Sequence, residues 1–293
     1  MNIALTGSTG FVGSHILSEL VSHGHQVTAL VRSEDEAIGV SKQGAKTAVV
    51  DLYDRPAVVR LLTNMDGSVH AASPGDETSA ALDSAMVDAV IEAFSGTGKP
   101  HIQISGIWVY GTNTDITEKS TFNPPPMVAW KANVEQRLLD ADGLRAIVPL
   151  VSVAYGDSGG GVPGVLLGSP RDDAGNLIMI GNGQQHWSTV HVADIADFFR
   201  RALENDSVRG YYVVGNGVNP TVAELTKAAA VAIGAPGAVP GSDDEARARL
   251  GDYFAGVLLL DQSTKAARAR GELGWQPRHP SLSDEFRTGS YHQ

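Results

Sequence analysis

The stretch MNIALTGSTGFVG, residues 1–13, decides the fold that the rest of the chain can adopt. Its apolar run at residues 3–5 is typical of a buried strand, and apolar residues at helical spacing begin at Phe11. Between the two, Gly7, Gly10 and Gly13 recur at every third position. Strand, glycine-rich turn and helix in this order predict a site where the helix N-terminus binds the pyrophosphate of a dinucleotide.

Each glycine of this turn has its own steric reason. Gly7 can adopt the backbone angles of a tight turn, Gly10 lets the main chain approach a pyrophosphate, and Gly13 lets the helix pack closely on the strand. The alternative is an ordinary strand-to-helix turn that merely uses glycine, and the order of the elements favours the dinucleotide site. The cofactor contacts expected in this turn are Gly7, Thr9, Gly10, Phe11, Val12 and Gly13.

The bulk composition restricts the class of partner. The 293 residues are 42% hydrophobic and 19% charged, which is typical of a globular protein. A formal charge of −11 argues against nucleic acid and anionic membranes, so we expect neither as a partner. Cysteine is absent and the nine histidines show no metal-ligand spacing, so we expect no metal site. Without a membrane-length apolar run or a signal-peptide pattern, we expect a cytoplasmic protein.

Strand-like runs alternate with helical patterns through the first half of the chain. Further strands are predicted at residues 27–31, 46–50, 68–72, 102–105 and 145–151. This alternation predicts an α/β fold, a doubly wound parallel sheet of the Rossmann type with right-handed crossovers. We expect the dinucleotide-binding domain over residues 1–155, with returning segments near 186–217, and a smaller, interleaved C-terminal substrate lobe over residues 156–293.

The end of the second predicted strand bears on the choice between NADP and NAD. An acidic residue there accepts a hydrogen bond from the ribose 2′-hydroxyl, whereas an arginine suits a 2′-phosphate. Arg32 and Ser33 stand at this place, so we predict NADP rather than NAD, with both residues as cofactor contacts. Two alternatives remain open: Arg32 as a solvated surface residue, and a phosphate site weakened by the acidic residues 34–36.

Two later strand ends add cofactor contacts. Asp51 can accept a hydrogen bond from the adenine amino group. Its other role, compatible with the first, is to cap the helix that begins near Arg55. Small residues after the fourth strand let the backbone lie against a flat cofactor. The contacts expected at these two strand ends are Asp51, Leu52, Ala71, Ala72 and Ser73.

Motifs spread over nearly the whole chain resemble the extended or atypical short-chain dehydrogenase/reductases, the group that includes nucleotide-sugar epimerases and dehydratases. The matching stretches lie in the order of that family, so the resemblance is more specific than any one motif. It implies the fold expected above and a nicotinamide cofactor. The stretches are residues 6–13, Asp51-Leu52, His70-x-Ala72, Ser105 with Val109-Tyr110-Gly111, residues 131–138, residues 189–196 and residues 273–277.

One departure from this family concerns the proton donor. In the family, a tyrosine four residues before a lysine moves a proton to or from the substrate oxygen, and the lysine lowers the pKa of that tyrosine and binds the nicotinamide ribose. Lys131 matches the lysine, but Met127 stands where the tyrosine belongs and Gly106 where the family has a hydroxyl residue. A thioether cannot relay a proton. The resemblance therefore implies that Lys131 still holds the ribose while the usual mechanism is missing.

Other side chains could replace the missing donor or contact the substrate. Ser105, Tyr155, His186 and a water held by Lys131 are the candidate donors, and Lys131, Ser105 and Tyr155 form the candidate catalytic set. Two tryptophans suggest an apolar pocket for an aromatic or hydrophobic substrate, although each could equally be a packed core residue. The candidate substrate contacts are Trp108, Met127, Tyr155, His186 and Trp187.

Three functions fit these observations. The first is an NADP(H)-dependent oxidoreductase acting on a small carbonyl, alcohol or enone. The second is an NADP-binding sensor or regulatory protein without redox catalysis, which the loss of both hydroxyls favours. The third is a nucleotide-sugar epimerase or dehydratase, whose chemistry depends on the missing tyrosine. The expected partner is a small-molecule substrate, and a homodimer is left open.

Overall fold

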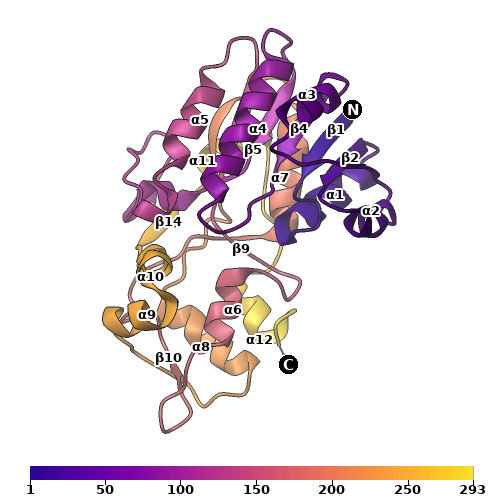
Figure 1. Ribbon diagram of the computed structural model, residues 1–293. Helices are drawn as coiled ribbons and strands as arrows, with labels where there is room; N and C mark the ends of the chain where they lie inside the picture. The colour runs from indigo at the N-terminus through magenta and orange to yellow at the C-terminus, as the bar shows by residue number, and fades with distance from the viewer. Residues whose placement is uncertain (293) are drawn as a thin grey trace.

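The computed structural model describes residues 1–292, and its centre is a parallel sheet (Figure 1). The strand order is β12-β8-β5-β4-β1-β2-β3, with β6 paired to β8. Every pairing in this sheet is parallel, which confirms the predicted doubly wound α/β fold. The strands are β1 (Asn2–Thr6), β2 (Gln26–Val31), β3 (Lys46–Val49), β4 (Gly67–His70), β5 (Pro100–Gln103), β6 (Ser105–Gly106), β8 (Arg145–Val151) and β12 (Gly210–Val214).

Helices cover both faces of this sheet, each with its own apolar core. One face packs against α1 (Phe11–Ser22), α2 (Glu34–Ser41), α7 (Val192–Glu204) and α11 (Ala267–Leu273). The other face packs against α3 (Arg55–Thr63), α4 (Ser79–Phe94) and α5 (Lys131–Leu139). Among the helices of residues 1–292, none combines the length and the apolar character needed to cross a membrane.

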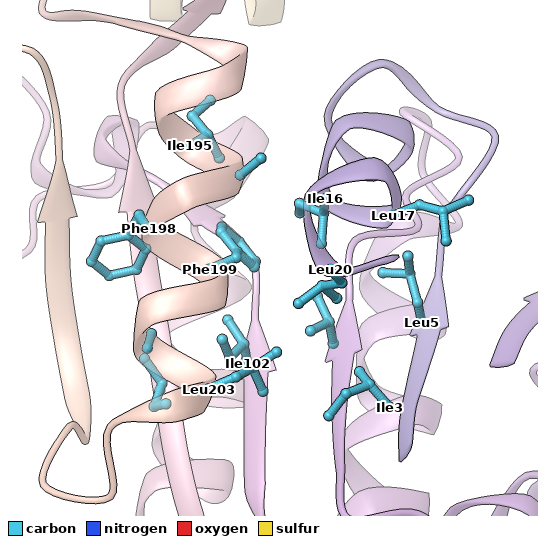
Figure 2. Packing of buried hydrophobic residues seen from close by; sticks show 14 of the residues in the cluster. Ile3, Leu5, Ile16, Leu17, Leu20, Ile102, Ile195, Phe198, Phe199 and Leu203 are labelled. Atoms are coloured by element: carbon cyan, nitrogen blue, oxygen red, sulfur yellow. The ribbon is translucent and has the colours of Figure 1, made fainter. Parts of the chain in front are cut away.

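The alternation of side chains along β1 shows how the two cores divide. Ile3 and Leu5 point to the α1 and α7 side, whereas Ala4 belongs to the opposite core. Figure 2 shows residues of α1, such as Leu20, facing these β1 side chains, and Phe199 of α7 packing beside Ile102 of β5. The glycine turn that follows β1 is therefore fixed by a strand buried on both sides.

A smaller C-terminal lobe lies below the sheet in Figure 1 and has a third core of its own. Three short parallel strand pairs and two 3₁₀ helices accompany it or join it to the sheet. Its elements and these connections are α6 (Gly161–Leu167), α8 (Val222–Ala232), α9 (Asp243–Leu250), α10 (Asp252–Leu258), α12 (Leu282–Thr288), β7 (Asn113–Ile116), β9 (Val153–Tyr155), β10 (Leu177–Ile178), β11 (Thr189–His191), β13 (Ala238–Val239), β14 (Gln262–Thr264), η1 (Ile107–Tyr110) and η2 (Pro126–Val128).

The start of α7 differs from the capping expected for an aspartate near its first turn. His191 is the N-cap, and its Nδ1 accepts from the backbone N–H of Ala193 at 3.2 Å. Asp194 is buried in the first turn and accepts from the backbone N–H groups of Arg278 and His279. His191 is therefore the cap of α7, and Asp194 anchors the segment at Arg278 to the first turn of this helix.

The α7 core contact gives a stability prediction. Phe199 is fully buried against β5, so Phe199→Ala should lower the free energy of unfolding by about 3–5 kcal/mol through lost contacts and a cavity. Tyr253→Ala is the matched control, because this ring is 68% exposed and its loss should cost less than about 0.5 kcal/mol. Urea denaturation measures both free energies, and equal losses would contradict a core in which Phe199 is a central packing residue.

Candidate functional site

The glycine turn between β1 and α1 has no room for side chains at two positions. Gly7 has φ +75°, and a Cβ there would lie 2.5 Å from the carbonyl carbon of Ala71 at the end of β4. A Cβ on Gly13 would lie 2.0 Å from the Gly7 carbonyl oxygen. Gly10 is the N-cap of α1 and offers no side-chain cap, so the first N–H groups of the helix stay available to an anion. The backbone thus forms a cradle for a phosphate.

A cavity of about 740 Å³ opens beside this turn, at the carboxyl ends of β1 to β4. It is large enough for the adenosine half of a dinucleotide. Some expected contacts lie outside its wall: Phe11, Val12 and Gly13 belong to α1, Ser33 caps α2, and Lys131 starts α5. The expected contacts that line it are Gly7, Thr9, Gly10, Arg32, Asp51, Leu52, Ala71, Ala72 and Ser73. Glu36 of the acidic run lines it too, as do Tyr53, Thr78 and Leu82, which the sequence patterns did not single out.

Asp51 is a wall residue of this cavity rather than a helix cap. Its Oδ1 accepts from the backbone N–H of Tyr53 at 3.0 Å. The cap of α3 is Asp54, whose carboxylate accepts from Ala57 N at 3.1 Å. The capping alternative for Asp51 is therefore wrong, and its carboxylate lines the cavity where an adenine amino group could donate to it.

Arg32 also lines the cavity, but it is paired with a carboxylate. Its Nε and Nη2 donate to Oε1 of Glu36 at 3.1 and 2.5 Å, and its backbone N–H donates to Oε2 at 3.0 Å. These hydrogen bonds hold the pKa of Glu36 below its ordinary value. The Arg32 side chain is otherwise 82% exposed, so a phosphate could reach it by competing with Glu36. The acidic competitor suspected among residues 34–36 is Glu36.

A buried chain of hydrogen bonds connects the glycine turn to Lys131. Thr6, the residue before Gly7, lies with its hydroxyl oxygen 2.6 Å from His70 Nδ1. His70 Nε2 lies 3.2 Å from one oxygen of Asp83 on α4, and Lys131 Nζ lies 3.4 Å from the other. Asp83 was missed by sequence reasoning, because a carboxylate in an apolar helix 48 positions from its lysine gives no local signal.

The proton positions in this chain follow from the donors present. The Thr6 oxygen accepts from the backbone N–H groups of Ala71 and Ala72, both at 3.3 Å, so its own proton points to His70 Nδ1. His70 therefore carries its proton on Nε2 and donates it to Asp83. Although burial works against the charged form, the hydrogen bond from His70 and the charge of Lys131 bring the pKa of Asp83 below its ordinary value. Asp83 is a buried carboxylate.

Ser105 and Glu135 form a second buried polar group, next to Lys131 on α5. Burial raises the pKa of Glu135, and the Ser105 hydroxyl and the Lys131 charge offset this only in part. Within residues 1–292, neither the Ser105 Oγ nor the Glu135 oxygens have a partner in hydrogen-bond geometry. Glu135 stands one helical turn after Lys131, which is the signal that could have drawn attention to it.

The remaining candidate residues occupy two kinds of place. Tyr155 is fully buried, donates to the Pro280 carbonyl at 2.7 Å and accepts from Asn216 at 3.1 Å, and burial raises its pKa. Trp187 is buried and donates to the Leu258 carbonyl at 3.0 Å. His186 pairs with Asp261 at 2.9 Å. Trp108 and Met127 lie elsewhere: both contact the core on the α3, α4 and α5 face of the sheet and the core of the lobe.

Met127 stands before α5 rather than within it. It lies in the 3₁₀ helix η2, and α5 begins four residues later at Lys131. In the described part of the chain, no three histidine or acidic side chains are grouped so that they could hold a metal ion.

Comparison with known proteins identifies the class to which this fold and site belong. The model of the NAD dependent epimerase/dehydratase family matches residues 3–215, so the chain belongs to that family. An uncharacterised protein of Schizosaccharomyces pombe is 28% identical over 99% of this chain and 100% of its own length. The 3-diazoavenalumate denitrifying reductase of a Streptomyces species is 26% identical over 97% of this chain and 98% of its own.

A solved structure supports the fold assignment. Human epimerase family protein SDR39U1 (isoform 2) with NADPH superposes with a TM-score of 0.77 at 20% identity, covering 100% of both chains. The resemblance to extended or atypical short-chain dehydrogenase/reductases is confirmed. The family and fold are those of nicotinamide-dependent enzymes.

The steric closure of the glycine turn gives the second prediction. Gly13→Ala should weaken NADPH binding by about tenfold or more, because the new Cβ displaces the Gly7 carbonyl and with it the phosphate cradle. Gly39→Ala in α2 is the control, since its Cβ meets nothing within 4 Å. Isothermal titration measures both affinities, and a Gly13 variant that binds like the Gly39 variant would contradict the proposed cradle.

Proposed function

We propose that this protein is an NADP(H)-dependent oxidoreductase that acts on a small electrophilic substrate such as a carbonyl compound or an enone. The observation that carries the proposal is the closed glycine cradle joined by the buried chain Thr6–His70–Asp83 to Lys131. A fixed lysine at this place would hold the nicotinamide half of the cofactor, which carries the hydride. A protein that only binds the adenosine half would not require such a lysine.

Distinct groups would hold the parts of the cofactor. The N–H groups at the start of α1 face the pyrophosphate, Asp51 accepts from the adenine amino group, and Lys131 donates to the nicotinamide ribose. When bound, a nicotinamide supplies or accepts a hydride, while the protein positions and polarises the substrate. Arg32 at the cavity wall favours a 2′-phosphate and hence NADP, and the NADPH held by human SDR39U1 agrees with this choice.

Reductive chemistry fits the residues around Lys131 better than epimerisation. Epimerisation through a keto intermediate removes and returns a proton at the substrate oxygen, and Met127 cannot do so. The Streptomyces relative is a reductase by name, which supports reduction in this family outside the nucleotide sugars. The Ser105 hydroxyl and the junction residues Trp108 and Met127 are the groups that would meet a substrate.

The second candidate is a sensor that binds NADP without redox chemistry. The observation that favours it is the thioether of Met127 together with the buried, hydrogen-bonded phenol of Tyr155, which removes two proton donors from the site. The fixed Lys131 and the separate C-terminal lobe favour the enzyme.

Arg32 gives a test of cofactor choice. Arg32→Ala should weaken NADPH binding by about tenfold, because a charge-assisted contact to the 2′-phosphate is lost, and should leave NADH binding unchanged. Glu36→Gln should act in the opposite direction, because it removes the carboxylate that now holds the guanidinium. Titration of each variant with both cofactors checks this, and wild-type protein that binds NADH as tightly as NADPH would contradict NADP selection.

Turnover separates the enzyme from the sensor. Stopped-flow oxidation of bound NADPH across aldehydes, ketones, enones and iminium ions should show at least one substrate for wild-type protein. Met127→Tyr should create or raise ketone reduction, because it supplies a phenol four residues before Lys131. Met65→Tyr is the matched control, since this methionine precedes β4 and so lies at the edge of the sheet opposite the cavity. NADPH that binds but is oxidised by no compound with either protein would favour the sensor.

A further inference from the structure

The Lys131 ammonium is neutralised inside the protein before any ligand arrives. Its Nζ lies 3.4 Å from Asp83, and the two side chains are only 17% and 6% exposed. Nζ also lies 4.4 Å from the centre of the Trp130 ring. The cation therefore has a carboxylate and an indole as its neighbours, and an ion pair this sheltered is weakly screened by solvent.

The other titratable groups packed against this pair are held by hydrogen bonds or by burial. His70 bridges Asp83 and Thr6 through its two ring nitrogens. Burial lowers the pKa of His101, behind His70, to about 3, which keeps it neutral. Burial raises the pKa of Glu135 and so favours its uncharged form. The Lys131 and Asp83 charges offset one another, so the lysine beside the expected nicotinamide ribose is a paired cation.

This charge balance favours a positively charged substrate over a neutral carbonyl compound. Hydride addition to a carbonyl leaves negative charge on oxygen, which requires a proton donor or an uncompensated cation. Lys131 is compensated, Met127 has no acidic proton, and Ser105 has no hydrogen-bond partner in the described structure that would make its hydroxyl more acidic. A substrate that starts positively charged has neither requirement, since hydride addition leaves it neutral.

We propose that the preferred substrates are organic cations that accept a hydride at an iminium carbon, bound beside the Lys131–Asp83 pair. This narrows the proposed reductase function and rests on it. The hydride adds to the iminium carbon, the C=N π pair becomes the lone pair of a neutral amine, and the reduced nicotinamide is oxidised. No proton is taken up, so the reaction does not need the missing tyrosine.

The aromatic and acidic character of the surroundings supports a cation. Trp108 and Met127 are partly buried where the sheet core meets the lobe, and Trp130 is partly buried in the sheet core beside Lys131. Indole faces and thioethers are polarisable neighbours for a flat cation. The formal charge of −11 on the chain attracts cations rather than anions.

Turnover of a matched pair of substrates is the first arm of the test. N-methyl-3,4-dihydroisoquinolinium is a permanent cation, and 2-tetralone is a ketone of similar size and shape. With saturating NADPH and a blank without enzyme, kcat/KM should be higher for the iminium by about a hundredfold. Asp83→Asn should reduce this preference by about tenfold, because it leaves the ammonium uncompensated.

Binding without turnover is the second arm and needs no cofactor. Calorimetric titration should show that N-methylisoquinolinium binds about tenfold more tightly than neutral 2-methylnaphthalene. Asp83→Asn should abolish this difference, and Lys131→Met should enlarge it because the carboxylate is then unpaired. The two variants move in opposite directions, so a general loss of folding cannot imitate the result, and either variant alone suffices if the other does not fold.

The outcomes separate the cation preference from the reductase function on which it rests. Equal or faster reduction of 2-tetralone by the wild-type protein would overturn the cation preference and leave the reductase standing. Equal binding of the two aromatic probes would also overturn it. Oxidation of NADPH by no compound would instead contradict the reductase function, whatever the binding arm shows.

Discussion

The contact between the Lys131 ammonium and the Asp83 carboxylate is the interaction on which the site depends. It joins the first turn of α5 to α4, and through His70 and Thr6 it reaches the residue before the glycine turn. Each side chain in this series contacts the next, and the last of them, the Thr6 hydroxyl, accepts from the backbone N–H groups at the end of β4. The glycine turn and Lys131 therefore belong to one hydrogen-bonded unit rather than to independent loops.

One steric and one electrostatic constraint act on the adenosine half of the site. At the glycine turn, backbone atoms occupy the space that any Cβ would need, so the phosphate cradle has one available shape. At the cavity wall, Arg32 and Glu36 place a cation and an anion side by side. In the proposed NADP site, a 2′-phosphate would compete with Glu36 for the guanidinium, which the exposure of the Arg32 side chain permits.

Local pattern was sufficient for the fold and for the adenosine half of the candidate site. The glycine spacing, the strand ends at Asp51 and Ala71 and the arginine at the tip of β2 are each encoded by a short stretch of sequence. Contacts that join distant segments were not predictable in this way. Asp83 lies on a helix that looks apolar, and Asp194 looks like a cap but binds the segment at Arg278. Tyr155 follows a strand of the main sheet, yet its ring is buried in the core of the lobe. Its hydroxyl donates to the Pro280 carbonyl and accepts from the Asn216 side chain.

The titration of the Asp83 carboxyl group is the most direct measurement of whether Lys131 is held by a buried carboxylate. It can be followed by the ¹³C chemical shift of that group, assigned by its loss in Asp83→Asn. If His70 donates to Asp83 and Lys131 pairs with it, this signal will titrate below the ordinary range of an aspartic acid. A midpoint above that range would mean that Asp83 is uncharged where the cofactor binds. The Lys131 ammonium would then be uncompensated, which would contradict the ion pair at the centre of the site.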